Sequence, residues 1–166
     1  IVFGVRPCDF RTSRFSVFGI DLVFANLPLA KQRGLIPARA NMEKLPFSDG
    51  FFEGVLAIGL FQYLSDLKPL LKEIHRVLKP GGEIICTTLN KDSWLRRIRY
   101  FILKTNQNFV ITTYRDQELI DDLSEVGFET KQLAYHLFPT TLTRFCDRPN
   151  SLWKRGAPSF TLKAVK

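Results

Sequence analysis

The fold of this chain is decided by LPFSDGFFEGVLAI (residues 45–58) together with RVLKPGG (residues 76–82). Residues 54–58 form a short apolar run without alternation, which is typical of a strand covered on both faces of a parallel sheet. The second segment closes with Gly81 and Gly82, which are typical of the turn after a helix. The stretch therefore predicts a loop, a buried strand, a helix and a turn, in that order, which is an α/β architecture.

A helix is predicted between these two segments. Pro69 is tolerated because it falls in the first turn, and Ser65 or Asp66 can cap the start. Lys79 ends the helix because a residue before proline disfavours the α conformation. A further strand is predicted from Glu83 to Thr88. The helix would bury the apolar residues that recur at helical spacing, which are Leu67, Leu70, Leu71, Ile74, Val77 and Leu78.

At this order and spacing, residues 45–47, 49–55 and 76–82 resemble the class I S-adenosylmethionine-dependent methyltransferases. The subgroup that they resemble most is the small-molecule one, similar to ubiquinone/menaquinone-biosynthesis enzymes (methyltransferase type 11). The resemblance implies an α/β fold with a Rossmann-like sheet, mostly parallel with an antiparallel last strand, and helices on both faces. It also implies S-adenosylmethionine as the cofactor and S-adenosylhomocysteine as the product.

Length and composition favour one methyltransferase-like domain over residues 1–166. Hydrophobic residues make up 45% and charged residues 24%, which is ordinary for a soluble globular protein. No apolar run approaches the roughly 20 residues of a membrane span, and no secretory signal is apparent, so we expect a cytoplasmic location. Cys8, Cys86 and Cys146 form no Cys-x-x-Cys pair, so reduced thiols and no metal site are expected.

The net charge of +8 is concentrated partly between Lys91 and Lys104, where basic and aromatic residues alternate. Such a segment suits peripheral contact with a membrane or a cover over an active site. The alternative, a helix packed on the sheet with its cations in water, is favoured. The fourth strand is not followed by an Asn-Pro-Pro-Tyr type motif, so a nucleic-acid base is an unlikely substrate by resemblance.

The N-terminus departs from the family pattern. Residues 1–5 predict a first buried strand, which in the family leads into a Gly-x-Gly-x-Gly turn against the cofactor. This chain has Arg6, Cys8 and Phe10 there, and the next predicted strand, residues 16–20, follows too soon for a normal helix. A damaged pocket, a missing part of the natural chain and a different ligand all remain open. We expect the N-terminal part of the fold to be incomplete.

Six residues at three predicted strand ends are candidates for cofactor binding: Asp21, Leu22, Asn41, Met42, Ile58 and Gly59. By resemblance, the Asp21 carboxylate accepts hydrogen bonds from the ribose hydroxyls. A helix N-cap ahead of residues 24–33 is a compatible alternative role. Asn41 follows a third strand at residues 36–40 and stands where the family usually has an aspartate that accepts from the adenine amino group.

Met42 would lie against the adenine face, although a turn and a core position would also explain Asn41 and Met42. Gly59 permits close approach at the end of the fourth strand, where ligands dock in such sheets. Gln62, Tyr63 and His136 are polar groups on the acceptor side. No catalytic residue is assigned.

The C-terminal part predicts a helix that ends at Gly127, with Thr113 and Asp116 in a capping box. Two antiparallel strands follow, at residues 128–137 and 160–165. The long connection between them shows no periodicity and is either a substrate wall or a loop with aromatic anchors.

The sequence therefore favours S-adenosylmethionine-dependent methyl transfer to a small-molecule or lipid-like acceptor. Transfer from a sulfonium needs chiefly the alignment of the acceptor with the methyl group, so no catalytic triad is required. The alternative is a catalytically impaired methyltransferase-like domain that serves as a binding or scaffold module. A nicotinamide-dependent reductase is a weaker hypothesis because it does not explain residues 76–82.

Overall fold

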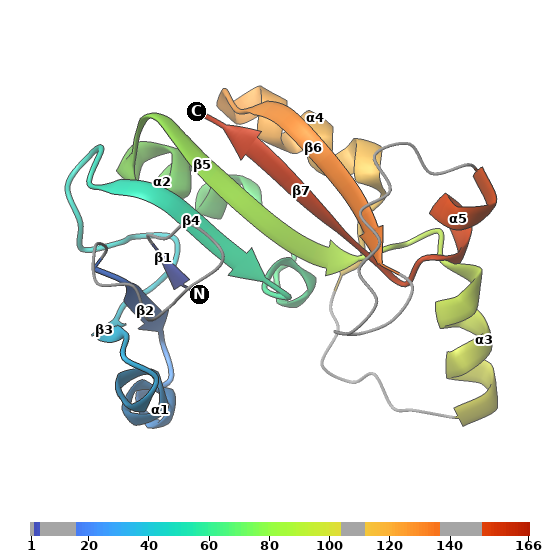
Figure 1. The fold of residues 1–166 in the computed structure, drawn as a ribbon, viewed down its shortest axis with the longest axis horizontal. Helices are drawn as coiled ribbons and strands as arrows, with labels where there is room; N and C mark the ends of the chain where they lie inside the picture. Colours follow the sequence, from blue (N-terminus) through green and yellow to red (C-terminus); the bar gives the residue numbers. More distant parts are fainter. Residues whose placement is uncertain (1, 4–15, 104–111, 137–150) are drawn as a thin grey trace.

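The computed structural model describes residues 2–3, 16–103, 112–136 and 151–166 (Figure 1). Within these residues, one seven-stranded sheet has the order β3-β2-β1-β4-β5-β7-β6. The strands are β1 (Val2–Phe3), β2 (Phe18–Asp21), β3 (Ile36–Arg39), β4 (Phe52–Ile58), β5 (Leu78–Leu89), β6 (Glu129–His136) and β7 (Ser159–Val165). The helices are η1 (Phe24–Asn26), α1 (Leu27–Gln32), η2 (Phe61–Tyr63), α2 (Lys68–Val77), α3 (Trp94–Leu103), α4 (Asp116–Val126) and α5 (Ser151–Gly156).

The predicted α/β sheet is confirmed. β2 pairs with β3 in parallel, as β4 does with β5, and the last strand, β7, runs antiparallel to both β5 and β6. Because the carboxyl ends of parallel strands share one edge, β2, β3, β4 and β5 all present their carboxyl ends on the same side. Helices pack against the sheet, with α1 on β2 and β3 and with α2 on β5.

The first strand differs from the prediction in its length and in its direction. β1 covers two residues in place of the predicted five, and it is antiparallel to β2 and to β4. Phe3, at its carboxyl end, pairs with Phe18 at the start of β2. An antiparallel pair can be joined by a short link, whereas a parallel pair needs a longer crossover, usually a helix. The 14 residues between Phe3 and Phe18 are enough for either connection, so the length of the link alone does not explain the antiparallel arrangement.

The helix predicted between residues 45–58 and 76–82, the two signature segments, is α2, but it ends earlier than expected. Pro69 falls in the first turn, as predicted. The cap residue is Leu67, which makes no side-chain cap hydrogen bond, and not Ser65 or Asp66; the Asp66 carboxylate nevertheless accepts from the Lys68 backbone amide at 2.9 Å. Leu78 already belongs to β5, so the helix stops at Val77 and the strand begins before Glu83. Gly81 has φ +75°, and its amide donates to the Lys166 carbonyl at 3.0 Å, which ties this turn to the end of β7.

Arg76 explains why the two signature segments occur together. Its guanidinium donates to both Glu73 carboxylate oxygens, at 2.6 and 2.9 Å, and to Asp49 at 2.6 Å. It also donates to the backbone carbonyls of Phe47 and Leu45, at 2.8 and 3.2 Å. One side chain therefore fastens the loop before β4 to the last turn of α2, and charge-assisted hydrogen bonds of this kind are the strong ones.

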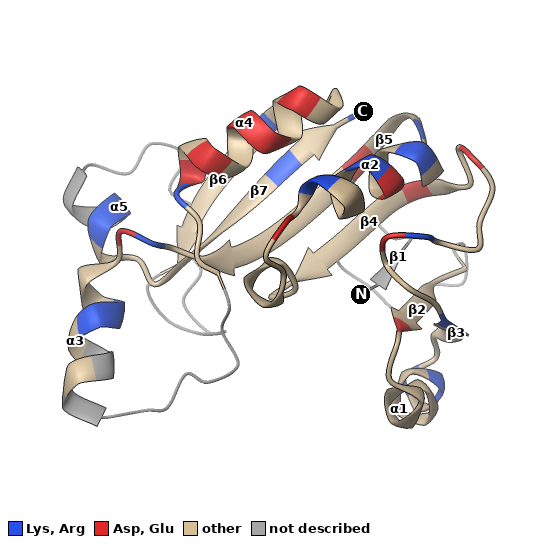
Figure 2. Ribbon diagram, turned by 180° about the vertical axis from the view of Figure 1, so that it is seen from behind, with Lys and Arg blue, Asp and Glu red and all other residues tan. Residues whose placement is uncertain are grey.

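The core lies between the sheet and the helices α2 and α4, which pack against each other on one face (Figure 2). A Lys68–Glu125 ion pair at 2.8 Å joins the two helices at their surface. Burial of each large apolar side chain contributes roughly 1.5–3 kcal/mol. The core includes Leu70, Leu71, Ile74, Ile84, Leu119, Leu123, Phe160 and Leu162, all fully buried.

The other predicted helices form with local differences. The segment predicted as one helix over residues 24–33 begins as η1 and continues as α1, and Gly34 follows with φ +80°. The predicted capping box is wrong in its register, because the Glu118 carboxylate accepts from the Arg115 amide at 3.0 Å. α5 lies in the connection expected to lack periodicity. No helix among the described residues is long and apolar enough to span a membrane.

Candidate functional site

The predicted cofactor residues lie along the carboxyl edge of β2, β3 and β4. Asp21 ends β2 and is paired in register with Arg39, the last residue of β3, two residues before Asn41. β4 ends at Ile58 and is separated from β2 by β1 alone. Neighbouring strands lie about 4.8 Å apart, so the ends of β2 and β4 are separated by about 10 Å.

The Asp21 carboxylate is held in place by the start of η1. One oxygen accepts from the Val23 amide and the other from the Asn26 side-chain amide, both at 2.8 Å. Asp21 is not the helix cap considered from the sequence, because Val23 is the cap residue of η1 and η1 has no side-chain cap hydrogen bond; the Asp21 carboxylate instead closes the turn that leads into η1. A carboxylate has about four acceptor positions, so both oxygens can accept further hydrogen bonds. Leu22, which follows, is 56% exposed, and its carbonyl accepts from the Arg39 side chain at 3.2 Å.

Asn41 and Met42 form a turn after β3. The Asn41 side-chain oxygen accepts from the Glu43 amide at 3.0 Å, and the Asn41 carbonyl accepts from Lys44 at 3.1 Å. Met42 is half-buried against the hydrophobic core. The turn and the core position considered from the sequence are therefore present, and the role of either residue toward adenine stays a prediction.

Gly59 leaves open space at the end of β4. Its φ is +61°, and a Cβ built there meets no atom within 4 Å. Its amide donates to the Thr87 carbonyl at 2.9 Å, which joins the ends of β4 and β5. Ile58 beside it is 66% exposed, which is unusual for a large apolar residue at a strand end. The carboxyl edge thus combines an open position, an acceptor carboxylate and exposed apolar side chains.

The residues that replace the glycine turn, Arg6, Cys8 and Phe10, lie outside the described residues. The direction of β1 nevertheless bears on that turn. The chain leaves β1 at Phe3, beside the amino end of β2, whereas Asp21 lies at the carboxyl end. In the described part of the chain, β1 therefore does not end beside Asp21 and Gly59 as the resemblance implied.

A chain of hydrogen bonds links the neighbouring strands β6, β7 and β5, and it includes His136, one of the polar residues predicted on the acceptor side. His136 Nε2 lies 2.7 Å from the Thr161 hydroxyl, which lies 2.8 Å from the Thr87 hydroxyl. Burial lowers the pKa of His136, so the ring is neutral at pH 7. The sequence pointed to His136 but not to the two threonines, because cross-strand partners depend on a register that a single strand does not reveal.

Gln62 and Tyr63 lie in η2, directly after Gly59. The Gln62 carbonyl accepts from the Thr112 amide at 3.1 Å, and the Tyr63 side chain is 47% exposed. Among the described residues, no three His, Cys, Asp or Glu side chains gather where they could hold a metal ion. Burial raises the pKa of the Cys86 thiol to about 12, so this thiol is un-ionised at neutral pH.

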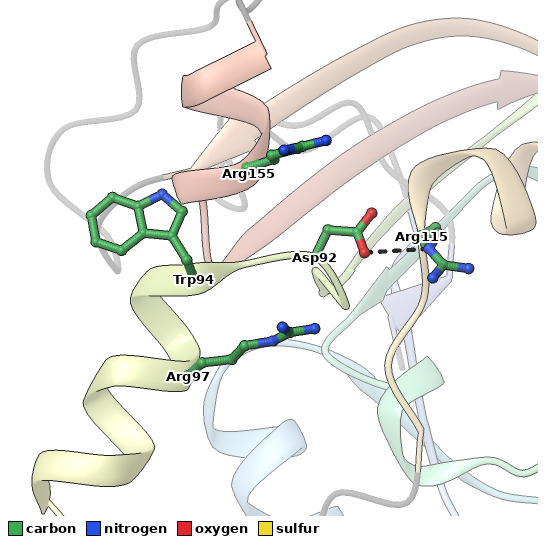
Figure 3. A pocket seen from close by; sticks show the side chains of 5 residues that line it. All are labelled: Asp92, Trp94, Arg97, Arg115 and Arg155. Carbon is green, nitrogen blue, oxygen red and sulfur yellow. Dashed lines mark hydrogen bonds and ion pairs between the residues drawn. The ribbon is translucent and has the colours of Figure 1, made fainter.

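A cavity of about 530 Å³ lies beyond the carboxyl end of β5. It is lined by Asp92, Trp94, Arg97, Arg115 and Arg155, which come from the segment after β5, from α3, from the start of α4 and from α5 (Figure 3). Its volume falls in the range of small-molecule sites, roughly 300–1,000 Å³.

Comparison with known proteins identifies the family to which this chain belongs. A family model described as a methyltransferase domain matches residues 4–86, which is half of the chain. The chain belongs to this methyltransferase domain family. S-adenosylmethionine is the cofactor that this membership indicates, as predicted from the signature residues.

Two curated relatives illustrate the similarity. An uncharacterized protein of Methanocaldococcus jannaschii is 30% identical over 126 residues, which cover 72% of this chain and 59% of that protein. The malonyl-[acyl-carrier protein] O-methyltransferase 1 of Coxiella burnetii is 35% identical over 133 residues, which cover 80% of this chain and 43% of that enzyme. The chain thus spans about half the length of these relatives.

Solved structures share the fold of this methyltransferase domain. A Thermotoga maritima protein described as a SAM-dependent methyltransferase, possible histamine N-methyltransferase, superposes with a TM-score of 0.74. The superposition covers 90% of this chain and 72% of that one, at 21% sequence identity. Identity this low supports the fold alone.

Proposed function

We propose that this methyltransferase domain binds S-adenosylmethionine at the carboxyl edge of β2, β3 and β4 and transfers its methyl group to a small-molecule or lipid-like acceptor. The observation that carries the proposal is that Asp21 and Gly59 lie at the carboxyl ends of β2 and β4, on the same edge of the sheet. The Asp21 carboxylate is oriented by two 2.8 Å hydrogen bonds and retains acceptor capacity. Gly59 leaves space in which a Cβ meets nothing within 4 Å.

Each candidate residue has a role that its surroundings allow. Asp21 accepts from the ribose hydroxyls, and the exposed side chains of Leu22 and Ile58 flank the cofactor. Asn41 accepts from the adenine amino group with the oxygen that also accepts from Glu43, since a carbonyl oxygen has two lone pairs. Met42 lies beneath the adenine ring from its half-buried position against the core.

S-adenosylmethionine supplies an activated methyl group on a sulfonium, so the chain itself has to bind, orient and exclude water. Thr87, Thr161 and the neutral His136 form a polar row at the adjoining strand ends, where an acceptor hydroxyl or amine can be oriented. A related enzyme from Coxiella burnetii is named malonyl-[acyl-carrier protein] O-methyltransferase 1, which supports an oxygen atom of an acyl group as the acceptor.

Peripheral membrane contact through residues 91–104 is part of the same proposal for a lipid-like acceptor. Within this segment, Ile98 is 47% exposed and Phe101 is 83% exposed. Figure 2 shows cationic residues on α3, the same helix. A basic helix with exposed apolar side chains suits an anionic membrane surface.

A second candidate function is a methyltransferase-like binding or scaffold domain that does not catalyse. One observation favours it, which is that β1 runs antiparallel and ends away from Asp21. Such a domain would keep its strand order and α2 while lacking the turn that encloses the methionine part of the cofactor.

Calorimetric titration of the protein with S-adenosylmethionine and with S-adenosylhomocysteine tests the proposal. We expect saturable binding in the micromolar range for both, and no comparable binding of NADH. Heat that does not saturate at millimolar ligand would refute the proposal. Cofactor binding without methyl transfer to any of a panel of carboxylate, hydroxyl and amine acceptors would favour the scaffold function.

A further inference from the structure

The cavity beyond β5 has a composition that the proposed cofactor site does not explain. Three guanidinium groups, from Arg97, Arg115 and Arg155, line it together with one carboxylate, Asp92. Figure 3 shows Arg97 and Arg155 extending from α3 and α5 on either side of Asp92. The lining therefore carries a net positive charge.

The three arginines differ in how their charge is compensated. Arg115 pairs with Asp92 at 3.3 Å and with Glu118 at 3.1 Å. Neither Arg97 nor Arg155 has a side-chain hydrogen bond or ion pair within the described residues. These two cations are therefore available to an anionic ligand, and Arg favours bidentate contact with a carboxylate or a phosphate.

Arg96, next to Arg97, adds a second sign of uncompensated positive charge. Its Nε atom is buried and has no hydrogen-bond partner among the described residues. Burial, and then the charge of Arg97, lower the pKa of Arg96. Two adjacent guanidinium groups without carboxylate partners raise the positive potential at the start of α3, which an anion would relieve.

The walls of the cavity are fixed to one another. Asn90 donates from its side chain to the carbonyls of Lys154 and Ala157, at 2.8 and 2.9 Å. The Ser93 hydroxyl donates to the Gly156 carbonyl at 2.9 Å. These bonds hold the start of α3 against the end of α5. The helices that carry Arg97 and Arg155 are therefore fixed relative to each other before a ligand binds, which lowers the entropy cost of binding.

The cavity lies within reach of the proposed methyl-transfer edge. Gly59 is bonded to Thr87, and Asp92 lies five residues further along the chain. A fully extended chain spans at most about 3.6 Å per residue, so Asp92 is no more than about 18 Å from Thr87. An elongated acceptor can occupy both places at once.

We propose that this cavity binds the anionic end of the methyl acceptor, a carboxylate or a phosphate, through Arg97 and Arg155. The inference rests on the proposed function for the choice of acceptor as ligand. Trp94, whose side chain is 46% exposed, provides an apolar wall for the part of the ligand next to the anion. Asp92 is already paired with Arg115 at 3.3 Å, so its charge is compensated within the lining.

Trp94 is also a reporter, because the chain contains two tryptophans and Trp153→Phe leaves only this one. In that variant, octyl phosphate and octanoate are titrated while Trp94 fluorescence is followed, with octanol as the neutral control. We expect both anions to change the fluorescence saturably and octanol not to. Arg97→Gln with Arg155→Gln should weaken binding at least tenfold.

The matched control, Arg33→Gln with Lys72→Gln, removes two positive charges outside the cavity. Its affinity for both anions should stay within twofold of the parent's. Arg97→Lys with Arg155→Lys keeps the charge and should retain part of the affinity, which separates loss of charge from misfolding. Equal binding by the Gln variant and the control would overturn the inference, as would equal binding of octanol. A third outcome would favour a membrane surface as the ligand. In that case the parent protein would bind phosphatidylglycerol vesicles but not octyl phosphate, and the Gln variant would lose vesicle binding; this result would overturn the inference.

Titration of the same proteins with S-adenosylhomocysteine keeps the two proposals separate. We expect the Arg97 and Arg155 variant to bind this cofactor product with unchanged affinity. Cofactor binding without anion binding would overturn the inference alone. Anion binding without cofactor binding would overturn the proposed function and with it the assignment of the anion as a methyl acceptor.

Discussion

Replacement of Asp21 by asparagine separates the two roles that the structure allows for this residue. The carboxylate accepts from the Val23 amide and from the Asn26 side chain, both at 2.8 Å. An asparagine can still accept from Val23, and the Asn26 amide can rotate to present its oxygen to the new amide group. Asn and Asp side chains form the same kind of turn with the backbone amide two residues on, so the free energy of unfolding should fall by less than about 1 kcal/mol.

Cofactor affinity should respond much more strongly to this change. A ribose diol donates two hydrogen bonds, and asparagine offers one oxygen in place of two charged ones. Loss of one hydrogen bond to a charged group costs about 1.5–3 kcal/mol, which is roughly a 10- to 150-fold increase in the dissociation constant. Asp21→Ala should lose both bonds to the ribose and, in addition, about 1 kcal/mol of stability from the lost hydrogen bonds to Val23 and Asn26.

Calorimetric titration with S-adenosylhomocysteine, alongside urea unfolding of the same samples, measures both quantities. The reasoning predicts that Asp21→Asn changes affinity while stability is nearly retained. A folded Asp21→Asn protein with parental affinity would refute the ribose role and leave Asp21 with only its structural role in the turn before η1.

Three further predictions concern other parts of the chain. Gly59→Val should weaken S-adenosylhomocysteine binding at least tenfold in a titration, whereas Gly34→Val, which has the same strain from a positive φ at the other edge of the sheet, should not. Burial lowers the pKa of His75 and His136, so stability should be constant above pH 6.5 and fall as the pH drops below it. Urea unfolding from pH 7.5 to 5 should show this loss, and substitution of both rings by uncharged residues should flatten it. Arg76→Ala should lower the free energy of unfolding by about 2 kcal/mol, because Glu73 loses its charged partner; a change below 0.5 kcal/mol would contradict the fastening role.

Much of the scaffold could be predicted because its signals are local. The apolar run before Ile58 predicted β4, and the helical spacing of Leu70, Leu71 and Ile74 predicted α2. The family resemblance added the mostly parallel, Rossmann-like sheet and the antiparallel last strand. The ends of the elements could not be predicted as well as their type. Leu78 was predicted at the end of α2 but begins β5, because an apolar residue fits the end of a helix and the start of a strand equally well.

The direction of β1 could not be predicted from the residues. A two-residue strand carries no periodicity, and its orientation depends on the strands that it meets, here Gly19 and Leu56 with Val2. The six candidate cofactor residues lie on one edge, but their contacts with a cofactor remain predictions. So does the single domain over residues 1–166.

The arginine-lined cavity was out of reach of sequence reasoning for a different physical reason. Arg97, Arg115 and Arg155 are far apart in the chain and meet because Asn90 and Ser93 fasten α5 to the start of α3. The sequence indicated a basic segment and an unassigned connection, and only their juxtaposition makes a site.

The central claim is that the carboxyl edge at Asp21, Asn41 and Gly59 holds S-adenosylmethionine. Ultraviolet cross-linking of radiolabelled S-adenosylmethionine, followed by mapping of the labelled peptides, tests it directly. We predict label in peptides that contain residues 21–26, 41–47 or 58–63, with competition by unlabelled S-adenosylhomocysteine. Label confined to other peptides, or label that S-adenosylhomocysteine does not displace, would contradict the claim.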